Sequence, residues 1–304
     1  MNIIDYRIVF YSVSGALVAA SIAALVVFGI PLGRDFTGGS LLELRYEEER
    51  PLIHEIQETF AQNGFPKALV QPTGADGFII RLPVMSEEEH QTLAQALGIG
   101  IAQLNTDESN PLIFEERFDS IGPVIGEELK RNAVIALIVA AAGIILYIAW
   151  AFRKVSKPIS SWKYGIVAVI ALAHDTIIPA GVFAVLGHWY GVEVDMLFIT
   201  ALLTILGFSV HDTIVVFDRV REHLRGGSVS DFALLVNQSV NETLIRSLNT
   251  SLTVVLVLSA ILFFGGSSTF YFVLALLIGV VVGTYSSIFI ASPLLVTIER
   301  WRRK

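Results

Sequence analysis

The chain of 304 residues contains no cysteine, which excludes disulfide bonds, catalytic thiolates and zinc–cysteine sites. It also lacks a phosphate-binding loop, because neither Gly38-Gly39 nor Gly226-Gly227 is followed by the Lys-Ser/Thr pair that such a loop needs. Charged residues make up only 16% of the chain, against about 25% in soluble domains. A protein so poor in charge, with a mean hydropathy of +0.66, is predicted to lie mostly in lipid.

Long apolar runs dominate the rest of the sequence. A helix needs about 20 apolar residues to span a bilayer, and six runs approach or exceed that length. They are residues 9–32, 133–152, 164–186, 196–217, 248–264 and 270–298. The fifth run is short, so we expect its helix to begin earlier, within residues 241–247. The fold class predicted is an α-helical polytopic membrane protein with six transmembrane helices, the first of them retained rather than cleaved.

Lysine and arginine gather on one side of these helices. They are Arg153, Lys154, Lys157, Lys163, Arg219, Arg221, Arg225, Arg300, Arg302, Arg303 and Lys304. The connections on the other side, residues 187–195 and 265–269, contain neither lysine nor arginine. By the positive-inside rule the basic side is cytoplasmic. Both termini are therefore expected in the cytoplasm, and the segment between the first two helices is expected to be extracytoplasmic.

That segment, residues 33–129, has the pattern of a folded α+β domain. Strands are predicted by apolar alternation at residues 40–46, 68–71, 78–82 and 112–118. Helical spacing predicts one helix over residues 51–63 and another that is capped by Ser86, has Glu89 three residues on, and runs toward Leu104. The order βαββαβ is that of a ferredoxin-like unit.

The composition of this domain limits its partners. Acidic residues outnumber lysine and arginine, with runs at 47–49 and 87–89, which disfavours nucleic-acid binding. On either side of the domain, the sequence predicts an N-terminal segment with the first helix at residues 1–32, helices two to six at 130–299, and a basic cytoplasmic tail at 300–304.

An ionisable pair, His211-Asp212, interrupts the fourth apolar run. A carboxylate at the centre of a transmembrane helix costs roughly 3 kcal/mol, so such acids usually face the bundle interior and mark an ion, proton or substrate route. Measured from the outer ends of their runs, Asp212 and Arg246 of the fifth helix both lie roughly 25–29 Å deep. Protonation of Asp212 would release an Asp–Arg pair, which is the basis of a proton-driven switch. The alternative is that Arg246 extends to the cytoplasmic surface and Asp212 is a structural hydrogen-bonding group.

A second pair, His174-Asp175, repeats the pattern in the third run at a depth that differs by roughly 7 Å. His174, Asp175, His211 and Thr213 are candidates for tuning or relay. A polar seam is also expected between the fourth and fifth helices, from Ser209, His211, Thr213, Asn249, Thr250, Ser251 and Thr253. The two His-Asp pairs could instead ligate a metal in a transporter or metalloenzyme. Their unequal depths and the absence of a His-Glu-x-x-His motif disfavour this alternative, so no metal site is predicted.

Three separated motifs resemble the SecF family of protein-export membrane proteins. They are Asp35-Phe36-Thr37-Gly38-Gly39-Ser40, Asp212-Thr213-Ile214-Val215-Val216-Phe217-Asp218-Arg219 and Gly283-Thr284-Tyr285-Ser286-Ser287-Ile288-Phe289-Ile290-Ala291. The resemblance covers nearly the whole chain. It implies the fold of the resistance-nodulation-division superfamily, a multi-pass location in the prokaryotic plasma (inner) membrane, and association with SecD and the SecYEG channel. It also implies an accessory subunit, not an enzyme, that uses proton flow to assist preprotein translocation and release, with no cofactor.

In that family the fourth-helix Asp and the fifth-helix Arg couple protons, and they correspond to Asp212 and Arg246. Family members commonly have Asn where His211 stands, a difference that would alter the working pH. In the last helix Gly279 and Gly283 form a small-xxx-small pair that permits close packing, with another helix of the bundle or with SecD. A small-molecule efflux subunit of the same superfamily is the alternative function, although such pumps carry duplicated helix sets and larger outer domains in one chain.

Overall fold

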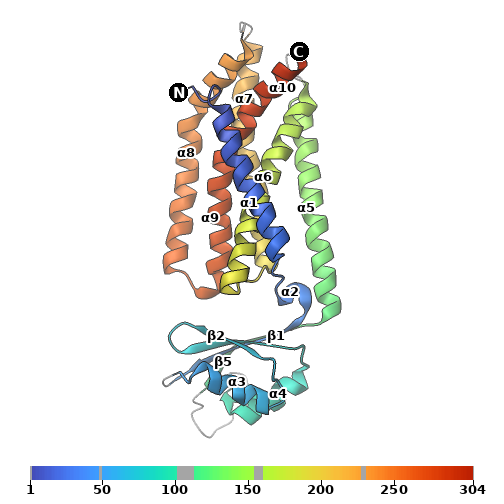
Figure 1. Cartoon of the computed structure of the whole chain (residues 1–304), viewed down its shortest axis with the longest axis vertical. Helices are drawn as coiled ribbons and strands as arrows, with labels where there is room; N and C mark the ends of the chain where they lie inside the picture. The colour runs from blue at the N-terminus through green and yellow to red at the C-terminus, as the bar shows by residue number, and fades with distance from the viewer. Residues whose placement is uncertain (1, 48–49, 101–112, 154–159, 227–230, 304) are drawn as a thin grey trace. The chain divides into compact units, whose positions relative to one another are not determined.

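The computed structural model describes residues 2–47, 50–100, 113–153, 160–226 and 231–303 (Figure 1). The chain divides into two compact units. One is a helical unit formed by Met1–Pro31 and Ala133–Lys304, and the other is an α+β unit formed by Leu32–Asn132.

Among the described residues, six helices are long and apolar enough to cross a membrane. Five of them are α1 (Arg7–Phe28), α5 (Pro123–Ala151), α6 (Ser161–Tyr190), α7 (Met196–Arg225) and α8 (Phe232–Phe264). The sixth consists of α9 (Phe270–Ser286), a π-helical segment (Ser287–Ala291) and α10 (Ser292–Arg303). The predicted set of six membrane-spanning helices is confirmed.

The start of α8 differs from the expectation. The helix begins at Phe232 rather than within residues 241–247, and the side chain of Asp231 caps it by accepting a hydrogen bond from the backbone N–H of Ala233 at 2.9 Å. Hydropathy misses the first part of α8 because polar and apolar side chains are mixed there, and several of the polar ones pair with α7. His223 of α7 contacts the Ser239 hydroxyl through Nδ1 at 3.0 Å, and this contact holds the early turns of α8 in place.

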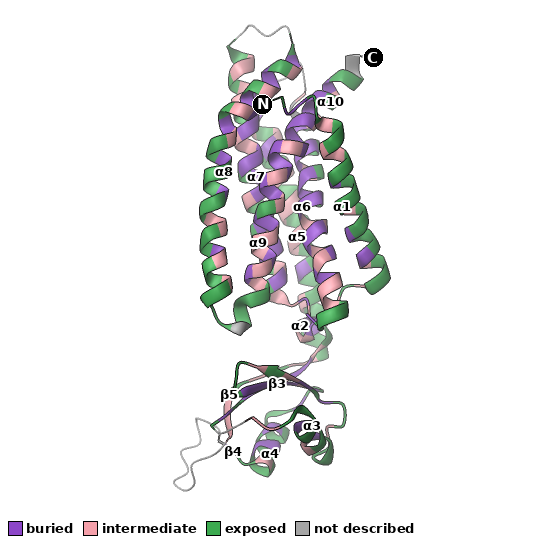
Figure 2. Cartoon of the chain, turned by 60° about the vertical axis from the view of Figure 1, so that its left-hand side comes forward, coloured by how far each residue is buried: buried purple, intermediate pink, exposed green. Residues whose placement is uncertain are grey.

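Burial separates inner from outer helices in the helical unit (Figure 2). In α6, α7 and the last helix, 56%, 50% and 61% of the most apolar window is buried inside the protein, against 11%, 11% and 17% in α1, α5 and α8. The three inner helices also contact one another directly. A polar side chain on their shared faces is therefore removed from both lipid and water.

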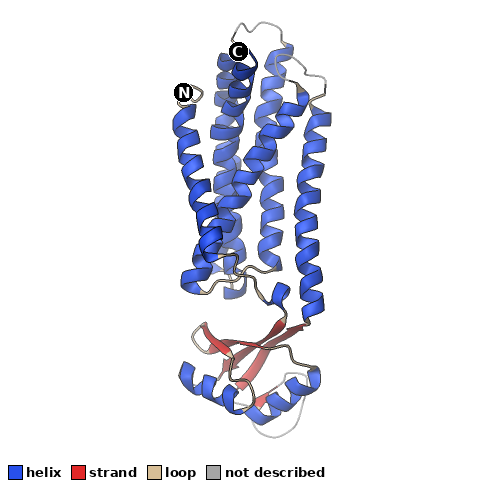
Figure 3. Ribbon diagram, turned by 45° about the vertical axis from the view of Figure 1, so that its right-hand side comes forward, coloured by secondary structure: helices blue, strands red, loops and turns tan. Residues whose placement is uncertain are grey.

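The α+β unit contains a five-stranded sheet in the order β2-β3-β1-β5-β4, with its two longer helices on one face (Figure 3). Its elements are α2 (Arg34–Thr37), β1 (Gly39–Tyr46), α3 (Ile53–Gln62), β2 (Leu69–Thr73), β3 (Gly77–Leu82), α4 (Glu87–Leu97), β4 (Ile99–Gly100) and β5 (Ile113–Ile121). The pairs β2·β3, β1·β3 and β1·β5 are antiparallel. This is the predicted ferredoxin-like βαββαβ arrangement, extended by the short edge strand β4, which runs parallel to β5.

Helix α4 is shorter than the helix that the sequence predicts, which runs toward Leu104. It ends at Leu97 because Gly98 adopts a left-handed conformation with φ of +64°, which closes the helix. Residues 101–104 and Leu112, the expected first residue of the last strand, lie outside the described residues.

Alternating side chains of the sheet form the core of the α+β unit. Leu42 and Leu44 of β1 lie opposite Ile80 and Phe78 of β3, and all four side chains are at most 1% exposed. Phe60 of α3, also 1% exposed, packs into the same cluster. Full burial of each such side chain contributes about 1.5–3 kcal/mol, so the sheet and its helices are held together mainly by this cluster.

Two glycines join α2 to β1. Gly38 has a φ of +76° and Gly39 a φ of +137°, conformations that other residues rarely adopt. A Cβ atom on Gly38 would lie 3.1 Å from Cα of Pro123, and one on Gly39 would lie 3.2 Å from the carbonyl oxygen of Leu82. The Gly-Gly pair is therefore required both by the backbone turn and by its close neighbours.

The first turn of α4 carries a capping box whose strength depends on pH. Glu89 accepts hydrogen bonds from the backbone N–H of Ser86 at 2.8 Å and from its hydroxyl at 3.1 Å, which lowers the pKa of the Glu89 carboxyl below its ordinary value of 4.5. A carboxyl with a lowered pKa stabilises the fold above its ordinary pKa, and this contribution is lost as the pH falls. We expect amide protection factors at the start of α4 to decrease as the pH falls below about 4.5.

Hydrogen exchange of the full chain, followed by mass spectrometry, measures this effect. Glu89→Gln should abolish the decrease, because its amide does not titrate in this range. Glu88→Gln changes the neighbouring carboxylate outside the capping box and should leave the decrease intact. Equal pH dependence in Glu89→Gln and in the unmodified protein would contradict the assignment.

Candidate functional site

Among the described residues, three carboxylates are buried in the helical unit: Asp175, Asp212 and, toward the end of the last helix, Glu299. Asp212 of α7 is 2% exposed and Asp175 of α6 is not exposed at all. The burial predicted for Asp212 is confirmed. The structure also gives Asp175, which sequence reasoning treated as secondary, the more enclosed position.

Asp212 lies where α7, α8 and α9 meet. The hydroxyl of Ser251 on α8 donates to Asp212 Oδ2 at 3.4 Å, and the hydroxyl of Thr284 on α9 donates to Ser251 at 2.6 Å. These neighbours are neutral hydroxyls. Among the described residues, no ion pair joins Asp212 to a lysine or arginine.

Arg246, the expected partner of Asp212, is exposed in this structure. Ser251, which contacts Asp212, lies five residues further along α8, so Arg246 is displaced along the helix axis by roughly 7.5 Å. The expected match in depth assumed that the outer ends of the two helices, the start of α7 and the end of α8, lie at the same level. Their register is set instead near the opposite end, where Arg219 pairs with Glu242.

The remaining candidate residues divide between exposed and buried positions. His211 is exposed, whereas the Thr213 hydroxyl is buried and lies 2.9 Å from the Ser287 hydroxyl of the π-helical segment. His174 Nδ1 lies 2.8 Å from Asp175 Oδ1. In the described part of the chain, no group of three or more His, Cys, Asp and Glu side chains could hold a metal ion.

Sequence reasoning missed the hydroxyls that the last helix supplies to this interior. Ser286 donates to Asp175 Oδ2 at 2.7 Å, and Thr284 and Ser287 reach the neighbourhood of Asp212 and Thr213. The signal was present in the sequence. Thr284, Tyr285, Ser286 and Ser287 are four consecutive side chains with hydroxyl groups in a mostly apolar helix.

Gly279 and Gly283 bring α9 close to α7. A Cβ atom on Gly279 would lie 2.1 Å from Cδ1 of Ile205, and one on Gly283 would lie 3.0 Å from Cβ of Ser209. The two glycines therefore pack within this bundle, and they let the hydroxyls of the last helix reach α7.

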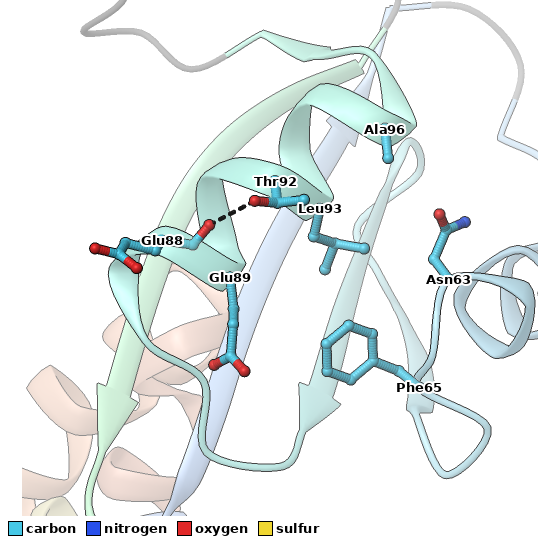
Figure 4. Close-up of a pocket in the computed structure, with 7 residues that line it drawn as sticks. All are labelled: Asn63, Phe65, Glu88, Glu89, Thr92, Leu93 and Ala96. Carbon is cyan, nitrogen blue, oxygen red and sulfur yellow. Dashed lines mark hydrogen bonds between the residues drawn. The ribbon is translucent and has the colours of Figure 1, made fainter.

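An open groove of about 400 Å³ lies between α4 and the segment that follows α3, within the α+β unit (Figure 4). Its lining residues are Asn63, Phe65, Glu88, Glu89, Thr92, Leu93 and Ala96. Two of its polar groups are committed to α4 itself, because Glu89 bonds to Ser86 and the Thr92 hydroxyl donates to the carbonyl of Glu88 at 2.8 Å. The groove is a surface feature of the α+β unit, and neither Asp175 nor Asp212 lines it.

Comparison with known proteins decides the family. Residues 102–301 match the family model described as protein export membrane protein SecD/SecF, C-terminal, and residues 23–49 match the SecD/SecF GG motif. The protein translocase subunit SecF of Thermobaculum terrenum is 43% identical, over 98% of this chain and 94% of that protein. The chain belongs to the SecF family of protein translocase subunits.

Other relatives agree with this assignment. SecF of Anaerolinea thermophila is 38% identical over 99% of this chain and 96% of that protein. The crystal structure of SecDF from Thermus thermophilus superposes with a TM-score of 0.80 and 35% identity. It covers all of this chain, which spans 39% of the longer SecDF chain. The GG motif of the family coincides with Gly38-Gly39, whose backbone and neighbours require glycine.

Proposed function

We propose that this SecF family subunit uses proton movement through its helical unit to assist preprotein translocation and release. The observation that carries the proposal is the buried carboxylate of Asp212, which in the described part of the chain accepts a hydrogen bond from the neutral Ser251 hydroxyl and forms no ion pair with a lysine or arginine. An acid in such a place costs free energy that a purely structural helix would avoid, and intramembrane acids facing a bundle interior mark ion or proton routes.

The proposed cycle has two states. In one, the Asp212 carboxylate pairs with Arg246; in the other, a proton that enters from the outer side neutralises Asp212 and Arg246 turns away. The contact of Ser251 with Asp212 and the exposure of Arg246 support a state in which the two residues are apart. Release of the proton to the cytoplasm resets the cycle. One charge crossing 100 mV supplies about 2.3 kcal/mol, enough to shift a helix-packing equilibrium substantially.

His211 and Thr213 would tune this step in different ways. His211 precedes the acid and is exposed, so its charge would act on Asp212 from outside the bundle. The buried Thr213 hydroxyl, held by Ser287, would link the acid's helix turn to the π-helical segment.

The proposed partners are SecD and the SecYEG channel, with a preprotein as the substrate. A fused SecDF protein supports SecD as a partner. This chain aligns with 38% of the Thermus thermophilus SecDF at 37% identity, so in that protein a part similar to this chain is joined to a further segment. The basic residues at one end of the helices support cytoplasmic termini and an extracytoplasmic α+β unit.

The function is tested by preprotein release from membrane vesicles that contain SecYEG and SecD, with and without this protein. Release should increase when this protein is present and a proton gradient is applied, and a protonophore should remove the increase. An increase that persists without a gradient would show a scaffold role, and no increase at all would contradict the assignment to preprotein release.

A further inference from the structure

Asp175 occupies a second buried polar site, formed by α6, α7 and α9. The Ser286 hydroxyl of α9 donates to Asp175 Oδ2 at 2.7 Å, and the Ser209 hydroxyl of α7 donates to the same oxygen. The other carboxylate oxygen lies 2.8 Å from His174 Nδ1. Every oxygen of this carboxylate is therefore engaged, although its side chain has no exposed surface.

The charges around Asp175 are few. Among the described residues, His174 is the only titratable side chain within hydrogen-bonding distance of it. From α9, the ring of Tyr285 stacks on His174 at a centroid distance of 6.3 Å, and from α7 the nearest acid is Asp212, about one turn beyond Ser209. The element α1 contributes the neutral Ser14, which bonds to the Tyr285 hydroxyl at 3.3 Å.

Charge balance in this enclosed place points to a bound proton. An ionised carboxylate that is fully buried needs either protonation or a cationic partner. The pair of His174 and Asp175 has no net charge in two forms: with a proton on the Asp175 carboxyl, or with a second proton on the His174 ring beside an ionised Asp175. Each form holds one proton more than an ionised Asp175 beside a neutral imidazole. His174 Nε2 is also buried and has no hydrogen-bond partner in the described structure, so the ring keeps one position free for a proton.

The Asp175 site shares structural elements with Asp212. Ser209 donates to Asp175 from α7, one turn before Asp212. The Ser287 hydroxyl reaches the carbonyl oxygen of Ser209 at 3.2 Å and the Thr213 hydroxyl at 2.9 Å, so it touches α7 on both sides of Asp212. A change in protonation at one acid therefore alters hydrogen bonds that also position the other.

We propose that His174 and Asp175 form a second proton-binding site, coupled to Asp212 through the hydroxyls of Ser209, Ser287 and Thr213. The proposal rests on the proposed function, in which Asp212 is the first site. It assigns His174 and Asp175 a proton of their own rather than a role in helix packing alone.

Infrared difference spectroscopy of the full-length protein in lipid nanodiscs tests the proposal. Protonated carboxyl groups give carbonyl-stretch bands that shift in D₂O and disappear as the acid ionises. Among the bands of the unmodified protein that titrate with pH, one should be absent from Asp175→Asn and another absent from Asp212→Asn. Each substitution should also shift the titration midpoint of the remaining band by about one pH unit, and by the same amount in both directions, as linkage between two sites requires.

Further variants separate titration from packing. Two other variants serve if Asp175→Asn fails to fold. Ser286→Ala removes one hydrogen-bond donor to Asp175, and His174→Gln removes the second titratable group, so each should shift the Asp175 band. The matched control is Thr204→Ala, on the same helix as Asp212, whose exposed hydroxyl only donates to Thr200 at 2.8 Å. It should change neither band.

Three outcomes would overturn the proposal. They are an Asp175→Asn spectrum identical to that of the unmodified protein, an Asp175 band that stays constant at every pH, and two bands whose midpoints are independent of each other. Failure of the proposed function gives a different result, because the Asp212 band would then be missing while the Asp175 band remains.

Discussion

Asp212→Asn is expected to abolish the part of preprotein release that depends on the proton gradient. The amide keeps the size of the side chain and its contact with Ser251, but it cannot bind and release a proton. A gradient that supplies about 2.3 kcal/mol per charge corresponds to an approximately 50-fold effect, so the loss should be of that order. Release that does not depend on the gradient should be unchanged.

The measurement is release in vesicles at matched protein levels, with and without a protonophore. Arg246→Met should lose the same component, because the cycle requires both members of the pair. Asp231→Asn is the matched control, since it makes the same chemical change at the helix cap of α8, where Asn caps as well as Asp. Full retention of gradient dependence in both Asp212→Asn and Arg246→Met would make the two residues structural.

Gly279→Ala is expected to destabilise the helical unit by about 1–3 kcal/mol, the usual cost of overpacking a core. The added Cβ atom would overlap Cδ1 of Ile205 at 2.1 Å, so α7 and α9 must move apart. This separation also lengthens the hydroxyl contacts between the two helices, so activity should fall together with stability. Thermal unfolding of the full chain in detergent measures the effect.

A second substitution and a control show whether crowding is the cause. Shortening the opposing side chain with Ile205→Ala should restore part of the stability lost in Gly279→Ala, so that the two changes are not additive. Gly143→Ala, on α5, is the matched control, because a Cβ atom there meets nothing within 4 Å. Unchanged unfolding in Gly279→Ala would mean that the helices separate at little cost.

The fold follows from patterns that are local in the sequence. Apolar runs gave the six helices, and strand alternation with a capping box gave the order of the α+β unit. The errors lie where polar residues extend a helix, as at the start of α8, and where one glycine ends a helix early, as at Gly98. Hydropathy does not record capping or pairing across helices, so it cannot place such boundaries.

The candidate site was only partly accessible from the sequence. The interior position of Asp212 followed from its place in an apolar run, because a carboxylate within a membrane-spanning helix is tolerated mainly where it faces the bundle interior. Its neighbours did not follow, since residue counts along two helices do not give their relative register. Arg246 and Ser251 lie five residues apart on α8, yet of these two it is Ser251 that contacts Asp212 in the structure.

The π-helical segment Ser287–Ala291 has a consequence for how the last helix presents its faces. A π-helical turn contains one residue more than an α-helical turn, so side chains beyond it are rotated by about 100° relative to an uninterrupted helix. The stripe of small residues that packs α9 against α7 therefore cannot continue along α10. If the extra residue moved one turn along the helix, the intervening side chains would rotate to a new face while both ends stayed fixed. Such a shift would exchange one set of neighbours for another without breaking the last helix or displacing it as a whole.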